Sequence, residues 1–189
     1  MLIAASLAAW PGAGSAGAPP CPNETTLGTL IDAPAYERSV ICLINRERAD
    51  AGRRPLRVNQ RLRRAATRYA MKLVADGFFA HDSPDGSSIL SRLQSVGYLE
   101  DAMTWDIAEN LYWATGTLNT PGAVVQAWSA SPVHRDNMLS PTFKEVGIGV
   151  AGGTPLSPTD PTSITVANEY GATVPKPPRD RKSGNHKRR

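Results

Sequence analysis

The sequence predicts an α+β domain in which several helices pack against a small, mostly antiparallel sheet. Residues 34–51 and 59–76 carry apolar side chains at helical spacing, which is typical of amphipathic helices. Residues 145–151 and 163–170 alternate larger side chains with small ones, which is typical of strands. With 189 residues, 41% of them hydrophobic, the chain is long enough to bury one core. We therefore expect a single layered domain over residues 34–174.

Local signals set the ends of the two long helices. Pro34 suits the first turn of the first helix, and Gly52 ends it. Asn59 is a favourable N-cap for the second helix, and Gly77 closes it. Residues 53–58, which lie between the two helices, are predicted to form an extended connector.

Shorter elements follow the second helix. They are predicted to be a short helix at 88–96, a loop at 98–106, a strand at 107–113, a helix capped by Thr120, and a helical turn that begins at Ser131. Pro121 and Pro132 each follow a cap directly, at the first helical position where proline is favoured. Because residues 152–161 are rich in glycine and proline, they are expected to join the last two strands as a long hairpin loop.

The start of the chain is typical of an exported protein. Residues 1–18 have an apolar centre followed by small residues, which predicts a secretory signal peptide. Residues 19–33 would then form an N-terminal arm of the secreted, extracellular protein. The alternative is a disordered leader rich in alanine, glycine and proline.

The positive charge of the chain is concentrated at its C-terminal end. The formal net charge is +4, yet the segment 176–189 alone carries seven Lys or Arg and one acidic residue. The remaining residues are therefore slightly acidic, which argues against specific nucleic-acid binding by the domain. Residues 175–189 are predicted to be a basic disordered tail that either contacts an anionic surface or is merely solvated.

The two cysteines of the chain, Cys21 and Cys42, predict one disulfide. An even cysteine count downstream of an export-like leader is typical of an oxidised pair. The bond would tie the arm to the first helix. The alternative is that Cys42 is a small buried apolar residue and that Cys21 is free.

Four side chains form the candidate site: His81, Glu109, His134 and Glu145. They include two of the three histidines in the chain. Their spacings of 28, 25 and 11 residues form no local motif. The segments around them carry more information than the four residues themselves.

These segments resemble a known family. The stretches are ICLINRERADAGRRPLRVNQRLRRAATRYAMKL, GFFAHDSPDGSS, AENLYW, SPVHRDNML and FKEVGIGVA. In this order they resemble the CAP superfamily of cysteine-rich secretory, antigen 5 and pathogenesis-related 1 proteins. Within it, they are most similar to the small secreted bacterial members called SCP-like. The resemblance covers residues 35–151 and extends along the last strand to Gly171.

The resemblance implies an α-β-α sandwich of the CAP type, with a cleft into which two His and two Glu project. Carried over to this chain, the cleft residues are His81 after the second helix, Glu109 in the Glu-Asn segment, His134 in the His-Arg segment and Glu145 before Val-Gly, with Asn110 and Asn137 as supporting polar positions. The chain has Ala108 where the family usually has glycine.

Two imidazoles and two carboxylates suit a divalent metal ion such as Zn²⁺. We expect His81 and His134 to be the direct ligands. Glu109 and Glu145 would then orient the imidazoles or position a metal-bound water. The alternative is a hydrogen-bonded His/Glu cluster that organises the cleft without a metal.

The predicted function is that of a secreted binding module for an extracellular ligand, either a peptide, a cell-envelope component or a lipid. No His-Glu-x-x-His or Gly-x-Ser-x-Gly motif is present in the sequence. A first alternative is a metal-dependent hydrolase in which Glu109 or Glu145 is the catalytic base. A second is a lipid or sterol carrier, which the resemblance to the family suggests.

Overall fold

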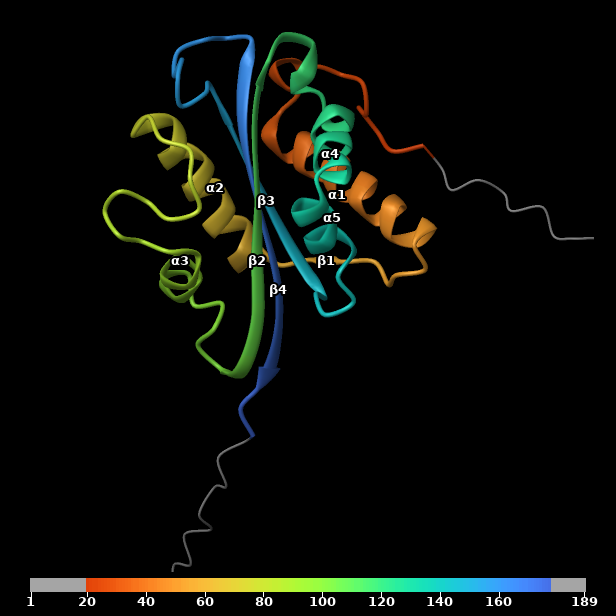
Figure 1. Cartoon of the computed structure of the whole chain (residues 1–189), viewed down its shortest axis with the longest axis vertical. Coiled ribbons are helices and arrows are strands. Elements are labelled where there is room, and N and C mark those ends of the chain that lie inside the picture. Colours follow the sequence, from red (N-terminus) through yellow and green to blue (C-terminus); the bar gives the residue numbers. More distant parts are fainter. Residues whose placement is uncertain (1–19, 178–189) are drawn as a thin grey trace, which may run out of the picture.

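A four-stranded sheet lies between two layers of helices in the computed structural model, which describes residues 20–177 (Figure 1). The helices are α1 (Ala33–Asp50), α2 (Gln60–Ala75), α3 (Ile89–Ser95), α4 (Pro121–Ala130) and α5 (Pro132–Leu139), and the strands are β1 (Arg57–Val58), β2 (Ala102–Thr115), β3 (Glu145–Gly152) and β4 (Ser163–Pro175). Helices α2 and α3 cover one face of the sheet, and α1, α4 and α5 cover the other. The predicted α-β-α sandwich is confirmed.

The predicted segments at the two ends of the chain fall largely outside this description. The leader at 1–18 and the tail from residue 178 onward lie outside the described residues. Within residues 20–177, no helix is both long and apolar enough to cross a membrane.

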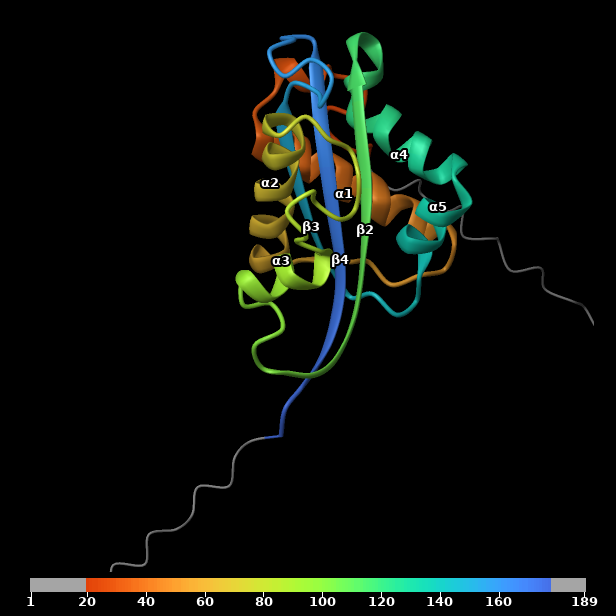
Figure 2. The same ribbon diagram turned by 60° about the vertical axis from the view of Figure 1, so that its left-hand side comes forward.

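The sheet is mostly antiparallel, as predicted. The strand order is β1-β3-β4-β2. Strand β4 pairs antiparallel with both β3 and β2, and only the two-residue strand β1 runs parallel to its neighbour β3. Figure 2 shows β2 and β4 as two long strands that lie side by side along the whole sheet. Glu109 is therefore held near the middle of a long strand pair, opposite Glu169.

The predicted helix caps are mostly present. The Asn59 side chain accepts from the backbone N–H groups of the first turn of α2. The Thr120 hydroxyl accepts from Ala123 N–H at 3.2 Å and begins α4, with Pro121 at its first position. Ser131 precedes α5 but makes no side-chain capping bond, and α5 is an eight-residue helix rather than a single turn.

The predicted loop at 98–106 is wrong in its second half, because β2 already begins at Ala102. Ala102 pairs with Pro175, so β4 also extends past the predicted end at residue 170. The early start of β2 and the late end of β4 pair with each other, so each is stabilised by the neighbouring strand and not by its own side-chain pattern. Residue 175 therefore belongs to the sheet, and the disordered tail cannot begin there as predicted. The backbone N–H of Lys176 also donates to Asp101 O at 2.8 Å.

Two glycines of β3 allow α2 to lie directly on the sheet. A Cβ atom at Gly147 would come within 2.1 Å of the Arg63 backbone, and one at Gly149 within 2.2 Å of the Thr67 backbone. The alternation of Gly with Val and Ile therefore has a structural reason. The glycine face receives the backbone of α2, while Val146 and Ile148 face the opposite core, which contains α1.

Cys21 and Cys42 form the predicted disulfide. The bond joins the N-terminal arm to α1, with the two Cα atoms 5.7 Å apart. Cys21 is buried in the same core as Tyr36 and Leu43 of α1. The arm is therefore fastened to the domain and not only connected to it in sequence.

Candidate functional site

The centre of the candidate site is a cluster of three ionisable side chains from three different elements, which we call the His81 cluster: His81, Arg92 and Glu109. Glu109 in β2 is almost fully buried, and its two oxygens have different partners. Oε1 lies 2.7 Å from His81 Nδ1, and Oε2 accepts from Arg92 Nη2 at 2.6 Å. Glu109 thus links the loop after α2 to helix α3.

Backbone contacts fix the position of His81. The hydroxyl of Tyr69 in α2 donates to Ala80 O at 2.6 Å and lies 3.0 Å from His81 O. Arg92 Nη1 donates to His81 O at 2.9 Å. The guanidinium of Arg92 also stacks on the Tyr69 ring, 3.4 Å from its centre, a favourable cation–π position. The imidazole therefore projects from a loop that two helices hold in place.

Glu169 of β4 lies fully buried directly behind the cluster. It is paired with Glu109 across the strands, and its Oε1 lies 3.9 Å from Arg92 Nη2. Neither of its carboxyl oxygens has a hydrogen-bond partner within residues 20–177. Burial and the negative charge of Glu109 hold the pKa of Glu169 well above its usual value. Arg92 therefore faces two acidic groups, of which one is fully desolvated.

His134 is half-buried near the beginning of α5, and two asparagines link its backbone carbonyl to that of Glu109, which accepts from Asn137 Nδ2 at 3.4 Å. Asn110 Nδ2 donates to His134 O at 3.0 Å, and Asn137 Nδ2 donates to Asn110 Oδ1 at 2.9 Å. Burial lowers the pKa of His134, and the charge of His81 lowers it further. The two asparagines lie where the resemblance suggested supporting polar residues.

Glu145 makes none of these contacts. Its carboxylate accepts from Asn59 Nδ2 at 3.1 Å and from the Tyr98 hydroxyl at 2.9 Å. By sheet geometry its Cα lies about 12 Å from that of Glu109, two strands across and two residues along. Glu145 therefore joins the start of α2 to the segment after α3. Of the four predicted side chains, only those of His81 and Glu109 are hydrogen-bonded to each other. The bond to His134 reaches its backbone carbonyl, and Glu145 has other partners.

The free ring nitrogen of His81 is the exposed reactive group of the cluster. Its side chain is 59% exposed, and within residues 20–177 no hydrogen bond uses Nε2. The hydrogen bond to Glu109 raises the pKa of His81 above 6.5. The described part of the chain holds no group of three or more His, Cys, Asp or Glu side chains arranged for a metal ion.

Two members of this site, Arg92 and Glu169, were not predicted from the sequence. Glu169 had an available signal, because it is the only charged residue between Ser163 and Val174. An isolated charge in a strand buried on both faces requires a partner. Arg92 had no such signal, since an arginine in a short amphipathic helix normally lies in solvent.

Glutamine in place of Glu169 is expected to raise the free energy of unfolding by about 1–3 kcal/mol near pH 8 and to change it little at pH 4.5. The pKa of Glu169 is higher in the folded protein than in the unfolded chain. The neutral carboxyl is therefore tolerated below about pH 4.5, and the protein loses stability as the pH rises through the folded pKa and the buried carboxyl ionises. Glutamine has no charge to bury and avoids this loss. Urea unfolding of both proteins at the two pH values measures the difference. The exposed Glu100→Gln is the control, and a gain from Glu169→Gln that is the same at both pH values would contradict the assignment.

Comparison with known proteins decides the family. A model of the cysteine-rich secretory protein family, CAP, matches residues 42–158. The chain belongs to the CAP family. Its CAP domain is 31% identical over 127 residues to the uncharacterized protein YkwD of Bacillus subtilis (strain 168). The matched part is 67% of this chain and 47% of YkwD, so the chain spans about half the length of that relative.

Solved structures of other CAP proteins share the fold. An outer surface protein of Borrelia burgdorferi superposes with a TM-score of 0.58 at 21% identity, over 71% of this chain and 90% of that one. An extracellular SCP-domain protein of Bacillus anthracis gives 0.57 at 19% identity, over 73% of this chain and 40% of that one. At these identities the likeness establishes the three-layer architecture only.

Proposed function

We propose that this CAP chain is an exported binding module whose cleft holds a divalent metal ion, with Zn²⁺ the best match, between His81 and His134. The observation that carries the proposal is the hydrogen bond between His81 Nδ1 and Glu109, because it leaves the exposed Nε2 free to bind a metal. A carboxylate that accepts the second N–H of an imidazole is the usual partner of a metal-binding histidine.

The second imidazole supports the same role. A metal ligand must be a neutral imidazole, and the lowered pKa of His134 favours the neutral form at physiological pH. Two nitrogen ligands leave further coordination positions of a Zn²⁺ ion open. Water, or an oxygen of an extracellular peptide or cell-envelope component, would occupy these positions. The metal would thus contribute Lewis acidity to ligand binding, while Glu109 and Arg92 hold the imidazole of His81.

Export is supported by the disulfide, since such bonds persist mainly in oxidising compartments. The outer-surface and extracellular relatives are consistent with the same location. Contact of the basic tail with an anionic surface remains a prediction, because that segment lies outside the described residues.

The contacts of the two glutamates favour binding over hydrolysis. A general base must have an oxygen within reach of the attacking water. Both oxygens of Glu109 are occupied by His81 and Arg92, and both oxygens of Glu145 by Asn59 and Tyr98. No contact within the described residues favours the carriage of a lipid or sterol.

Zn²⁺ is expected to raise the melting temperature of the protein and to bind it in calorimetric titration. His81→Ala combined with His134→Ala should abolish both effects. Glu109→Gln should weaken the affinity by about 10–100-fold, because it removes the carboxylate that orients His81. All variants are made in a His186→Ala background, so that the imidazole of the tail contributes nothing.

Glu145→Gln is the matched control, since it changes a glutamate that lies outside the His81 cluster. It should leave the Zn²⁺ response unchanged. Because the pKa of His81 is raised, protons should begin to compete with the metal already above pH 6.5, and affinity should fall steadily below that value. A Zn²⁺ response that persists in the double histidine variant would refute the site.

A further inference from the structure

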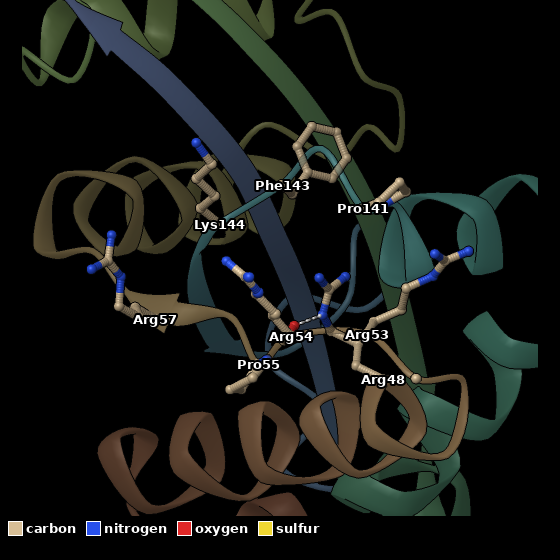
Figure 3. Close-up of a pocket in the computed structure, with 9 residues that line it drawn as sticks. Arg48, Arg53, Arg54, Pro55, Arg57, Pro141, Phe143 and Lys144 are labelled. Carbon is tan, nitrogen blue, oxygen red and sulfur yellow. Dashed lines mark hydrogen bonds between the residues drawn. The ribbon is translucent and has the colours of Figure 1, made fainter.

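A strongly basic hollow of about 730 Å³ lies between the end of α1 and the segment that follows α5 (Figure 3). Its walls come from residues 52–57 on one side and 141–144 on the other. None of its lining residues belongs to the His81 cluster. Its volume lies in the range of about 300–1,000 Å³ that is common for small-molecule sites.

The lining contains five cationic side chains and no acidic one: Arg48, Arg53, Arg54, Arg57 and Lys144. Within residues 20–177 none of these five forms a salt bridge, whereas Arg46, Arg63, Lys72 and Arg92 all do. The positive charge of the hollow is therefore not compensated by the protein itself. Concentrated like charge of this kind attracts anions.

Arg48 forms a rigid floor for the hollow. It is only 1% exposed, and its donors reach backbone carbonyls of one wall and of the chain just before the other wall. Nε donates to Arg54 O at 2.8 Å, and Nη1 donates to Met138 O at 2.6 Å and to Ser140 O at 3.0 Å. Within the described residues no hydrogen bond uses Nη2. Burial lowers the pKa of Arg48, as does the nearby charge of Arg53.

A buried guanidinium without a carboxylate is costly for a protein to maintain. Here the Arg48 guanidinium links the chain after α1 to the chain after α5. The same two stretches also pair as strands β1 and β3, and Arg57 N–H donates to Lys144 O at 3.0 Å. The backbone of the two walls is thus held in place before any ligand binds, while the side chains of Arg54, Arg57 and Lys144 are exposed. In Figure 3 the Arg54 side chain lies between those of Arg48 and Lys144, Arg57 lies farther out on the same side as Lys144, and Phe143 lies at the edge of the view of the hollow.

The geometry points to a binding site for a multiply charged phosphate, either a soluble polyphosphate or phosphate ester or the headgroup of a phospholipid. Four of the five cations are arginines, whose planar guanidinium groups match phosphate oxygens in pairs. Several guanidinium groups around one opening require a ligand with several negative charges. The site is separate from the proposed metal site and does not depend on it.

Calorimetric titration of the full chain with inorganic tripolyphosphate tests the inference. The buffer holds 150 mM salt, which screens isolated exposed charges beyond about 8 Å, and EDTA, which excludes a metal bound at His81. We expect saturable binding that Arg54→Gln with Arg57→Gln weakens by about tenfold or more, because hydrogen bonds to charged groups are lost. Arg48 is left unchanged, since its replacement would disturb the fold.

The matched control is Arg38→Gln with Arg68→Gln, which removes the same charge from exposed positions outside the hollow. This pair should change the affinity by less than about twofold. Equal weakening by both pairs would overturn the inference, since it would reveal unspecific attraction to the basic chain. Absence of binding at 150 mM salt, or equally tight binding of citrate, would also overturn it.

Co-sedimentation with vesicles distinguishes the two sources of phosphate. Vesicles of phosphatidylcholine alone are compared with vesicles that also contain a phosphoinositide. Retention on the second kind that is lost in Arg54→Gln with Arg57→Gln would identify a headgroup as the ligand. Tripolyphosphate binding without pocket-dependent retention would identify a soluble phosphate.

Discussion

Methionine in place of Arg92 is expected to lower the free energy of unfolding by about 3–5 kcal/mol. Arg92 is the cation that faces both Glu109 and Glu169, at 2.6 and 3.9 Å, and all three side chains are nearly or fully buried. Methionine keeps the apolar stem of the side chain but removes the charge, the stacking on Tyr69 and the hydrogen bond to His81 O. Removing one member of a buried ion pair is costly because the opposite charge is left unpaired in a medium of low polarity.

A double-mutant cycle measures how much of this loss is electrostatic. Glu109→Gln removes the charge that Arg92 compensates, so the pair Arg92→Met with Glu109→Gln should be less destabilised than the sum of the single changes by at least about 1 kcal/mol. Arg68→Met, at an exposed position of α2, should cost less than about 0.5 kcal/mol. If urea unfolding shows that the free-energy losses of the two single variants simply add in the double variant, Arg92 acts only through packing.

The elements that could be predicted from the sequence are those with local causes. Asn59 and Thr120 cap α2 and α4 with their own side chains, and each signal lies within four residues of the bond that it makes. Strand β1 and the first half of β2 have no such cause. They are strands because β3 pairs with β1 and β4 pairs with β2. The side-chain pattern of a segment does not reveal a pairing partner that is distant in the sequence.

The same distinction applies to the candidate site. His81, Glu109 and His134 could be selected because their flanking segments resemble the CAP family. A hydrogen bond joins the side chains of His81 and Glu109, whereas His134 is reached through its backbone carbonyl. Glu145 was selected by the same criterion, yet the register of β3 places it beside Asn59 and Tyr98. Neighbouring residues in a motif do not fix which cluster a side chain joins, because that depends on strand order.

Alanine in place of Gly149 is expected to destabilise the protein by about 3 kcal/mol or more, at the upper end of the range for overpacking. The new Cβ would lie 2.2 Å from the backbone nitrogen of Thr67. No rotamer change can relieve this contact, since both atoms are fixed to their backbones. Helix α2 would have to move away from the sheet, and the Tyr69 hydroxyl, which holds the His81 loop, would move with it.

Gly152→Ala is the control for this prediction. Gly152 lies in the same strand, but a Cβ atom there would meet nothing within 4 Å. Its replacement should therefore change the unfolding free energy by less than about 1 kcal/mol, since only the backbone preference of glycine is removed. Equal urea midpoints for the two variants would show that α2 does not lie on the glycine face of β3. If α2 does move, Gly149→Ala should also weaken the Zn²⁺ response, because Tyr69 of α2 holds the His81 loop.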